Sequence, residues 1–189
     1  MQEIFDVAVF GGGIIGRLTA WYAGKSGKRT LLLEKNSFDS PQGSSRGYSR
    51  AFGEAYADDL YYQISHQSRY LWHSLERETG EKLLHLSGGI DISAGGNLRG
   101  NVSKVVSALE SRGSSFELLN SVELSRRYPQ WKCDSGVLAI YSPDTGILDA
   151  ERCMKAASIP ATARSAFRTC MRRTGSQYHR GTACRPITT

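Results

Sequence analysis

The sequence predicts an α/β protein that begins with a β-α-β unit over its first 35 residues and continues into a β-rich region. Two short apolar runs, at 5–10 and 29–34, flank a helical pattern, and three glycines follow the first run directly. Continuous apolar runs of this kind are typical of buried parallel strands, and a helix between them gives a right-handed crossover. The second run ends at Glu34, so we expect this carboxylate at the carboxyl end of a strand.

One long helix and several shorter elements are expected after this unit. Asp58 or Asp59 is a suitable N-cap for the long helix, which runs to about Thr79 and stops at Gly80. Its apolar residues share one face; they are Leu60, Ile64, Leu71 and Leu75. Strand-like runs occupy 83–86, 89–93, 116–119, 136–141 and 146–148, and helical patterns occupy 102–111, 121–127 and 149–157.

The regular pattern stops after Ala157, which divides the chain into an N-terminal part, 1–157, and a basic irregular tail, 158–189. The tail contains no acidic residue and no sustained apolar period. One interpretation is a disordered basic segment. The interpretation we favour is that the tail derives from a frameshift or a retained intron, which makes residues 1–157 a truncated N-terminal part.

The net charge of +6 does not predict a nucleic-acid partner, because the basic residues are unevenly placed. Residues 152–189 hold eight Lys and Arg and no acidic residue, whereas residues 1–151 hold 16 basic and 18 acidic residues. No basic helical face is evident in the tail. A nucleic-acid or anionic-membrane binder acting through the tail is therefore the least favoured alternative.

Composition also bears on membranes, metals and compartment. No apolar run approaches the ~20 residues that span a bilayer, so we expect no membrane partner. The acidic N-terminus is unlike a secretory signal, and the last three residues are not a peroxisomal signal, which leaves the cytoplasm as the default compartment. The four cysteines have no paired spacing, and no metal site is predicted.

The glycine run fits the dinucleotide-binding pattern G-x-G-x-x-G. Gly11 permits the tight turn, Gly13 lets the backbone approach a pyrophosphate, and Gly16 lets the helix lie close to the strand. The helix N-terminus then offers N–H groups to the phosphates. Glu34, eighteen residues beyond Gly16, is placed to accept hydrogen bonds from a ribose and disfavours the 2′-phosphate of NADP. The candidate residues of this motif are Gly11, Gly12, Gly13, Ile14, Ile15, Gly16, Glu34 and Lys35.

The segment after the motif favours FAD over NAD as the cofactor. A Ser- and Gly-rich loop at 36–49, a long helix and a β-rich region follow, whereas nicotinamide enzymes usually continue with further β-α repeats. An NAD-dependent dehydrogenase stays open as a lower alternative.

Three segments together resemble the FAD-dependent D-amino-acid oxidase superfamily, nearest the group of monomeric sarcosine oxidase and N-methyltryptophan oxidase. They are DVAVFGGGIIGRLTAWYAGKSGKRTLLLEK, GSSRGYSRAFGEAY and PDTGILDAERCMKA, and the resemblance covers about residues 5–157. It implies a Rossmann-type FAD-binding core with an incomplete substrate domain. The implied activity is oxidation of a C–N bond in a small amine or amino-acid-like substrate, with O₂ as acceptor.

The resemblance also implies roles for individual residues. Ser44, Ser45 and Arg46 run beside the pyrophosphate and flavin, where their hydroxyls and charge suit phosphate oxygens. Arg50 matches an arginine near the flavin ring and is the candidate catalytic residue. Related oxidases carry a second arginine that holds the substrate carboxylate, and Gly53 stands there in this chain.

The resemblance finally implies that much of the enzyme is missing from this sequence. In the family, the rest of the substrate sheet and the later FAD contacts lie beyond the point where the pattern stops here. We therefore expect the chain to be too short for activity. A non-catalytic fragment with residual dinucleotide binding is the main alternative to a flavoenzyme, and the sequence makes no prediction of oligomeric state.

Overall fold

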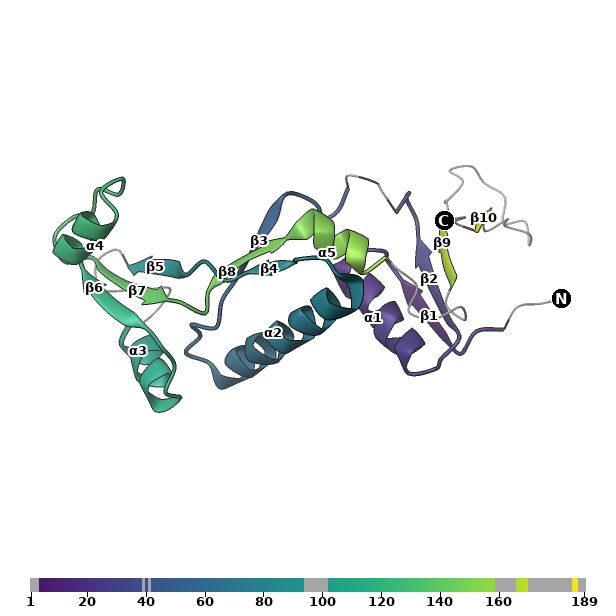
Figure 1. Cartoon of the computed structure of the whole chain (residues 1–189), viewed down its shortest axis with the longest axis horizontal. Coiled ribbons are helices and arrows are strands. Elements are labelled where there is room, and N and C mark those ends of the chain that lie inside the picture. The colour runs from purple at the N-terminus through teal and green to yellow at the C-terminus, as the bar shows by residue number, and fades with distance from the viewer. Residues whose placement is uncertain are drawn as a thin grey trace, which may run out of the picture. The chain divides into compact units, whose positions relative to one another are not determined.

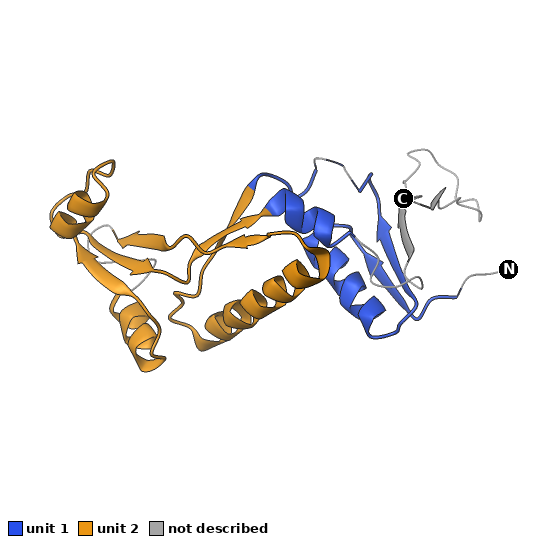
Figure 2. Ribbon diagram, viewed as in Figure 1, with its two compact units in different colours: residues 1–48, 150–189 blue, residues 49–149 orange. Residues whose placement is uncertain are grey.

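The computed structural model describes residues 4–38, 40, 42–93, 102–158, 166–169 and 185–186. The chain forms two compact units, shown in different colours in Figure 2. Unit 1 comprises residues 1–48 and 150–189, and unit 2 comprises residues 49–149. Unit 2 is therefore an insertion in the sequence of unit 1, whereas the sequence pattern predicts residues 1–157 as one part.

Unit 1 begins with the predicted β-α-β unit, which the structure confirms (Figure 1). Its elements are β1 (Val7–Phe10), α1 (Ile14–Lys25) and β2 (Thr30–Glu34). The two strands are parallel, with Val7 opposite Thr30 and Phe10 opposite Leu33. Ala20 of α1 packs with Leu32 of β2 and with Phe38 in a buried cluster, so the helix covers the sheet through small and aliphatic side chains.

The same sheet continues beyond Ala157. After α5 (Ala150–Ala156), strand β9 (Ala166–Thr169) pairs in parallel with β2, and β10 (Arg185–Pro186) pairs antiparallel with β9. The strand order is β1-β2-β9-β10. The sequence pattern predicts no regular element after Ala157, because strands of four and two residues are too short to show a period. The remaining residues of that tail, apart from Ser158, lie outside the described part of the chain.

Unit 2 contains two antiparallel sheets with three helices (Figure 1). The order of the first sheet is β3-β8-β4, and that of the second is β5-β7-β6. The strands are β3 (Ser49–Phe52), β4 (Leu84–His85), β5 (Gly89–Ser93), β6 (Glu117–Asn120), β7 (Leu138–Ser142) and β8 (Gly146–Asp149). The helices are α2 (Asp59–Thr79), α3 (Val102–Ser111) and α4 (Ser121–Arg127). The sequence predicts all of these strands and helices except β3, whose four residues include Ser49 and Arg50.

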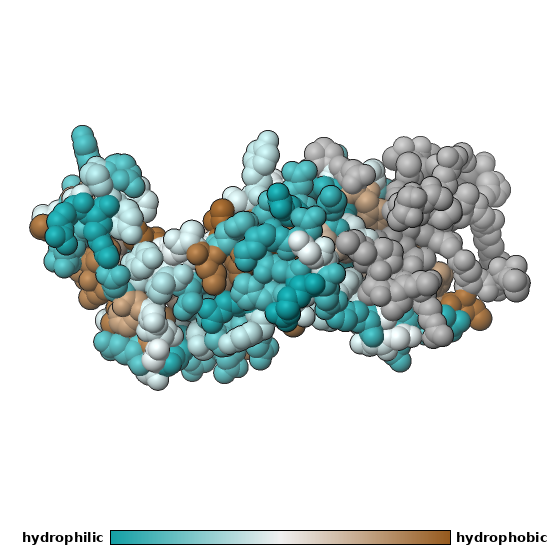
Figure 3. Space-filling model, viewed as in Figure 1, coloured by the Kyte–Doolittle hydropathy of each residue, from teal (hydrophilic) through white to brown (hydrophobic). Residues whose placement is uncertain are grey.

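The core of unit 2 lies on both faces of the second sheet. Val102 and Leu109 of α3 pack on Ile140 of β7, and Leu124 of α4 packs with Leu119 and Ala139. Because Ala139 and Ile140 are adjacent in β7, their side chains point to opposite faces of the sheet. On the face drawn in Figure 3, apolar surface gathers at the end of unit 2 that carries α3, α4 and β6. Val122 and Leu118 are among the exposed apolar side chains of these elements.

Helix α2 begins and ends where the sequence predicts. The Asp58 carboxylate accepts hydrogen bonds from the N–H groups of Leu60 and Tyr61, at 2.9 and 3.1 Å. Gly80 ends the helix in the left-handed conformation, with φ of 71°, which a residue with a Cβ adopts at a cost. The four apolar residues predicted to share one face of α2 are not all buried. Leu75 is buried, whereas Leu60, Ile64 and Leu71 are exposed. No helix in the described residues is both long enough and apolar enough to cross a bilayer.

Glu76 ties the last turns of α2 to the segment that enters β4. Its carboxylate accepts hydrogen bonds from the N–H groups of Leu83 and Leu84, at 2.8 and 2.9 Å, and lies 2.7 Å from Nδ1 of His73. Burial alone would raise the pKa of Glu76. The hydrogen bonds from His73, Leu84, Leu83 and Lys82 outweigh that effect and lower the pKa to about 2.

Replacing Glu76 with glutamine is expected to lower the free energy of unfolding by about 2 kcal/mol at pH 7, because charge-assisted hydrogen bonds are lost. The folded pKa lies below the ordinary value of 4.5. The stabilisation is therefore present above pH 4.5 and is lost as the pH falls toward 2. Urea unfolding of both proteins between pH 7 and 3 should show the difference shrinking at the acid end. Glu78→Gln, at an exposed position of the same helix, is the control, and a difference that does not change with pH would contradict the assignment.

Candidate dinucleotide site

A pocket of about 370 Å³ lies in unit 1, where the loops that follow β1 and β2 meet. This volume is within the range of small-molecule and cofactor sites. The lining includes seven of the residues predicted from the sequence to bind the cofactor: Gly12, Gly13, Glu34, Lys35, Ser44, Ser45 and Arg46. The structure thus brings the glycine motif, the end of β2 and the Ser-rich loop to one cavity.

The glycines leave room that side chains would fill. Gly11 has φ of 102°, a left-handed value that favours glycine. A Cβ on Gly16 would lie 1.9 Å from the carbonyl oxygen of Gly11, which is backbone and cannot rotate away. A Cβ on Gly13 would lie 3.2 Å from Oγ of Ser45. The loop is therefore closely packed against α1, and without side chains at these positions its backbone can approach a bound pyrophosphate. The residues present fit a dinucleotide.

Glu34 closes one side of the pocket and holds the glycine loop. Its Oε2 accepts a hydrogen bond from the N–H of Gly12 at 2.5 Å, and its Oε1 accepts one from the N–H of Asn36 at 2.9 Å. Burial opposes ionisation, but the backbone N–H groups of Asn36, Gly12 and Lys35 lower the pKa of Glu34 overall. An ionised carboxylate has about four acceptor positions, so this group retains capacity for ribose hydroxyls.

The Ser-rich loop reaches the N-terminus of α1. Oγ of Ser45 accepts a hydrogen bond from the N–H of Ile14 at 3.0 Å, across 31 positions of sequence. That N–H belongs to the first turn of the helix, where donors have no partner within the helix. A phosphate oxygen suits the same donor. Arg46 also faces this region and donates a hydrogen bond to the carbonyl oxygen of Phe38.

The other predicted site residues do not line the pocket. Gly11 and Gly16 shape the loop beneath it, Ile14 contributes its backbone N–H, and the side chain of Ile15 is exposed. Arg50 belongs to unit 2, where it lies in β3 and donates a hydrogen bond from Nη1 to the carbonyl oxygen of Ser49 at 2.6 Å. Its catalytic role stays a prediction.

Sequence reasoning missed Arg17, which also lines the pocket and is only 3% exposed. A signal for it exists in the sequence. The buried positions of α1 are Arg17, Ala20, Trp21 and Gly24, spaced as one helical face. An arginine on a face that is otherwise apolar or small must find hydrogen-bond acceptors inside the protein.

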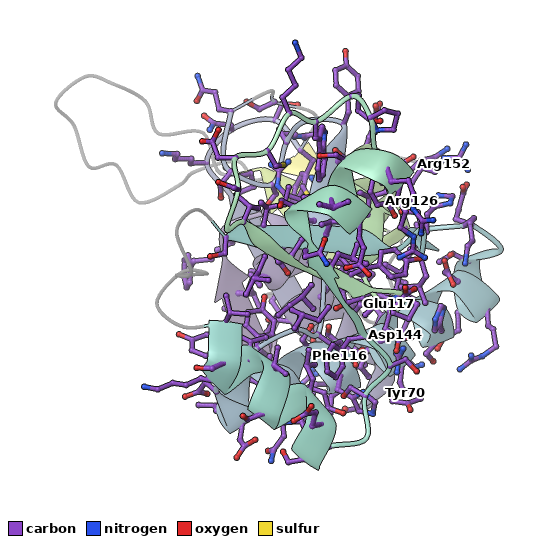
Figure 4. The ribbon with its side chains drawn as sticks, turned by 90° about the vertical axis from the view of Figure 1, so that its left-hand side faces the viewer. Tyr70, Phe116, Glu117, Arg126, Asp144 and Arg152 are labelled. Atoms are coloured by element: carbon purple, nitrogen blue, oxygen red, sulfur yellow. The ribbon has the colours of Figure 1, made fainter. Side chains whose placement is uncertain are left out.

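A separate group of charged side chains in unit 2 surrounds the buried residue Glu54. Glu54 lies 2.8 Å from Nδ1 of His66 and 3.1 Å from Nε of Arg69, and Arg69 also pairs with Asp144 at 2.8 Å. Figure 4 labels Asp144 and Tyr70, whose ring packs edge-on against that of His66. This network joins three segments of unit 2. In the part of the chain that the structure describes, no group of three metal-binding side chains occurs.

A family model described as FAD dependent oxidoreductase matches residues 6–182. The chain belongs to this family. The match confirms the predicted family and its cofactor, FAD, and it extends past Ala157 into residues 158–182, for which the sequence pattern predicts an irregular tail.

Similar proteins agree with this membership. Human peroxisomal sarcosine oxidase is 30% identical over 155 residues, which are 82% of this chain and 39% of that protein. Monomeric sarcosine oxidase from Bacillus sp. (strain B-0618) is 31% identical over 169 residues, which are 88% of this chain and 43% of that protein. The chain thus spans about 40% of the length of these relatives.

Solved structures support the fold. NikD, described as an unusual amino acid oxidase essential for nikkomycin biosynthesis, matches with a TM-score of 0.79 at 24% identity, covering 89% of this chain and 43% of NikD. Glycine oxidase from Geobacillus kaustophilus matches with a TM-score of 0.71 at 21% identity, covering 86% of this chain and 46% of the oxidase. These likenesses confirm the α/β fold with its Rossmann-type core.

Proposed function

We propose that this chain binds FAD in the pocket of unit 1 and supplies the cofactor-binding part of an oxidase that acts on small amines or amino-acid-like substrates. The reaction is oxidation of a C–N bond with O₂ as acceptor. The observation that carries the proposal is the convergence of the glycine loop, Glu34 and the Ser44–Arg46 segment on one cavity. Neither nucleic acid nor a membrane is part of the proposal.

Each part of the pocket is suited to a different part of the dinucleotide. The first N–H groups of α1, at Ile14 and after it, suit the diphosphate, and the hydroxyls of Ser44 and Ser45 add donors. Arg46 offsets phosphate charge, and Glu34 accepts from ribose hydroxyls. Bound FAD supplies the electron acceptor for C–N oxidation, and the protein's part is to hold it, orient it and adjust local charge.

We propose Arg50 as the catalytic residue, on the strength of its match to the family arginine near the flavin ring. A cation there stabilises negative charge that develops during oxidation. Gly53 leaves no second arginine to hold a substrate carboxylate. A Cβ on Gly53 would lie 3.2 Å from Oγ1 of Thr145, so a longer side chain would first meet that threonine. The proposed substrate is therefore an amine that does not depend on this carboxylate contact.

A second candidate is a dinucleotide-binding fragment that does not turn over. It is favoured by one observation, which is that the pocket is lined by residues of unit 1 alone. Binding of a dinucleotide and turnover of a substrate are therefore separable properties of the chain.

Titration of the purified chain with FAD tests the proposal. Quenching of flavin fluorescence and a shifted visible spectrum should show saturable binding of one FAD per chain, with NADH and NADPH competing poorly. A peroxide assay with sarcosine and other N-methylated amines, on the FAD-loaded chain, then separates the two candidates. Binding without peroxide favours the fragment. Failure to bind FAD, together with saturable NADH binding, would instead favour a nicotinamide-dependent dehydrogenase.

A further inference from the structure

The guanidinium of Arg17 is buried at the base of the dinucleotide pocket. Its Nε donates a hydrogen bond to the carbonyl oxygen of Gly12 at 2.6 Å, its Nη2 to that of Phe38 at 2.6 Å, and its Nη1 to that of Met154 at 3.1 Å. Nη1 also donates to Oγ of Ser158. The ring of Phe38 lies under the guanidinium, 5.1 Å from Cζ.

The three carbonyl groups belong to three separate segments of unit 1. Gly12 is in the glycine loop, Phe38 is in the loop after β2, and Met154 is in α5. All three residues line the pocket. One side chain therefore connects three walls of the cavity, and the planar guanidinium fixes their relative positions because its donors point in fixed directions.

Two cationic side chains, Arg17 and Arg46, meet in the lining of the pocket. The carbonyl oxygen of Phe38 accepts from Nη2 of Arg17 and also from Nη2 of Arg46, so two guanidinium groups converge on one atom. Two cations in the lining of one pocket suit an anionic ligand such as a diphosphate.

We propose that Arg17 is a positioning residue for the diphosphate of the cofactor. It sets the glycine loop against the loop after β2, so that the N–H groups of α1 and the Arg46 guanidinium serve one anion. This inference rests on the proposed function, because it requires that the pocket binds FAD. Arg17 acts through the backbone that it holds, and it is distinct from the glycine, serine and glutamate positions that the sequence motif identifies.

The test compares Arg17→Met and Arg17→Lys with the unsubstituted chain at a temperature where circular dichroism shows all three folded. We expect Arg17→Met to bind FAD at least about tenfold more weakly. Lysine keeps the charge but has a single ammonium that cannot connect the same three carbonyl groups. We therefore expect Arg17→Lys to regain less than half of the lost binding free energy.

Two further readouts separate positioning from general stability. The ratio of ADP to adenosine affinity, measured by displacement of FAD, should fall in Arg17→Met, since only ADP carries the diphosphate. Arg29→Met is the matched control, because Arg29 forms an exposed ion pair with Asp6 at the opposite end of β2. It should leave both the FAD affinity and the ADP-to-adenosine ratio unchanged.

The outcomes distinguish this inference from the proposed function. If the unsubstituted chain binds no FAD, the proposed function fails and the inference fails with it. If it binds FAD and Arg17→Met binds within twofold, only the inference is overturned. Full rescue by lysine, or an equal loss for ADP and adenosine, would also overturn it. If Arg17→Met does not fold, the Arg17→Lys protein decides by the same measurements.

Discussion

Replacing Gly16 with alanine is expected to disrupt the β-α-β unit and abolish FAD binding. The added Cβ would lie 1.9 Å from the carbonyl oxygen of Gly11 and 3.5 Å from Cγ1 of Val9. Since the nearest atom is backbone, α1 must move away from the glycine loop, which separates the helix N-terminus from the pocket. We expect the free energy of unfolding to fall by about 3 kcal/mol or more, measured by urea unfolding, with no saturable FAD binding.

Gly13→Ala is the informative comparison for this prediction. Its Cβ would lie 3.2 Å from Oγ of Ser45, a side-chain atom that can shift by a few tenths of an ångström. Gly13 has φ of −71°, which any residue adopts. We expect stability to change by less than about 1 kcal/mol, while the methyl group obstructs the approach of the diphosphate and weakens FAD binding by about tenfold. If Gly16→Ala folds and binds FAD normally, the assignment of the glycine motif is wrong.

The parts of the fold that the sequence predicts well are those set by neighbouring residues. Helix α2 begins at Asp59 and stops at Gly80 because a carboxylate caps its first N–H groups and a glycine accepts a left-handed φ. The glycine loop is similar, since Gly11 and Gly16 satisfy steric demands within six residues. Each of these local requirements places a particular residue type at a fixed spacing, so a sequence pattern predicts it.

The parts that the sequence does not predict depend on contacts between distant segments. Strand β9 is recognisable only through its pairing with β2, about 135 positions earlier, and β3 only through β8. Arg17 becomes a pocket residue because Phe38 and Met154 bring carbonyl groups to it from two other segments. The contact of Ser45 with Ile14 likewise requires the folded loop. No local pattern specifies such partners.

Replacing Glu34 with alanine is expected to weaken FAD binding by about 100-fold. The carboxylate holds the N–H groups of Gly12 and Asn36 and retains acceptor capacity for the ribose. Alanine leaves these partly buried donors without their acceptor and removes the ribose contact, and each lost charge-assisted hydrogen bond is worth about 1.5–3 kcal/mol. Glutamine keeps one acceptor oxygen, so Glu34→Gln should lose about tenfold. Fluorescence titration of FAD measures both, with Asp6→Asn, an exposed acid of the same unit, as the control.

The pH dependence of binding gives an independent check on Glu34. Its pKa is lowered from the ordinary value of 4.5, so the carboxylate stays ionised through neutral and mildly acidic pH. FAD affinity of the unsubstituted chain should therefore be flat from pH 8 to 5 as far as Glu34 is concerned. Below that range the advantage over Glu34→Gln should decline, because protonation removes acceptor positions on the carboxyl group. An advantage lost near pH 7, or equal affinities at neutral pH, would show that Glu34 does not contact the cofactor as an ionised acceptor.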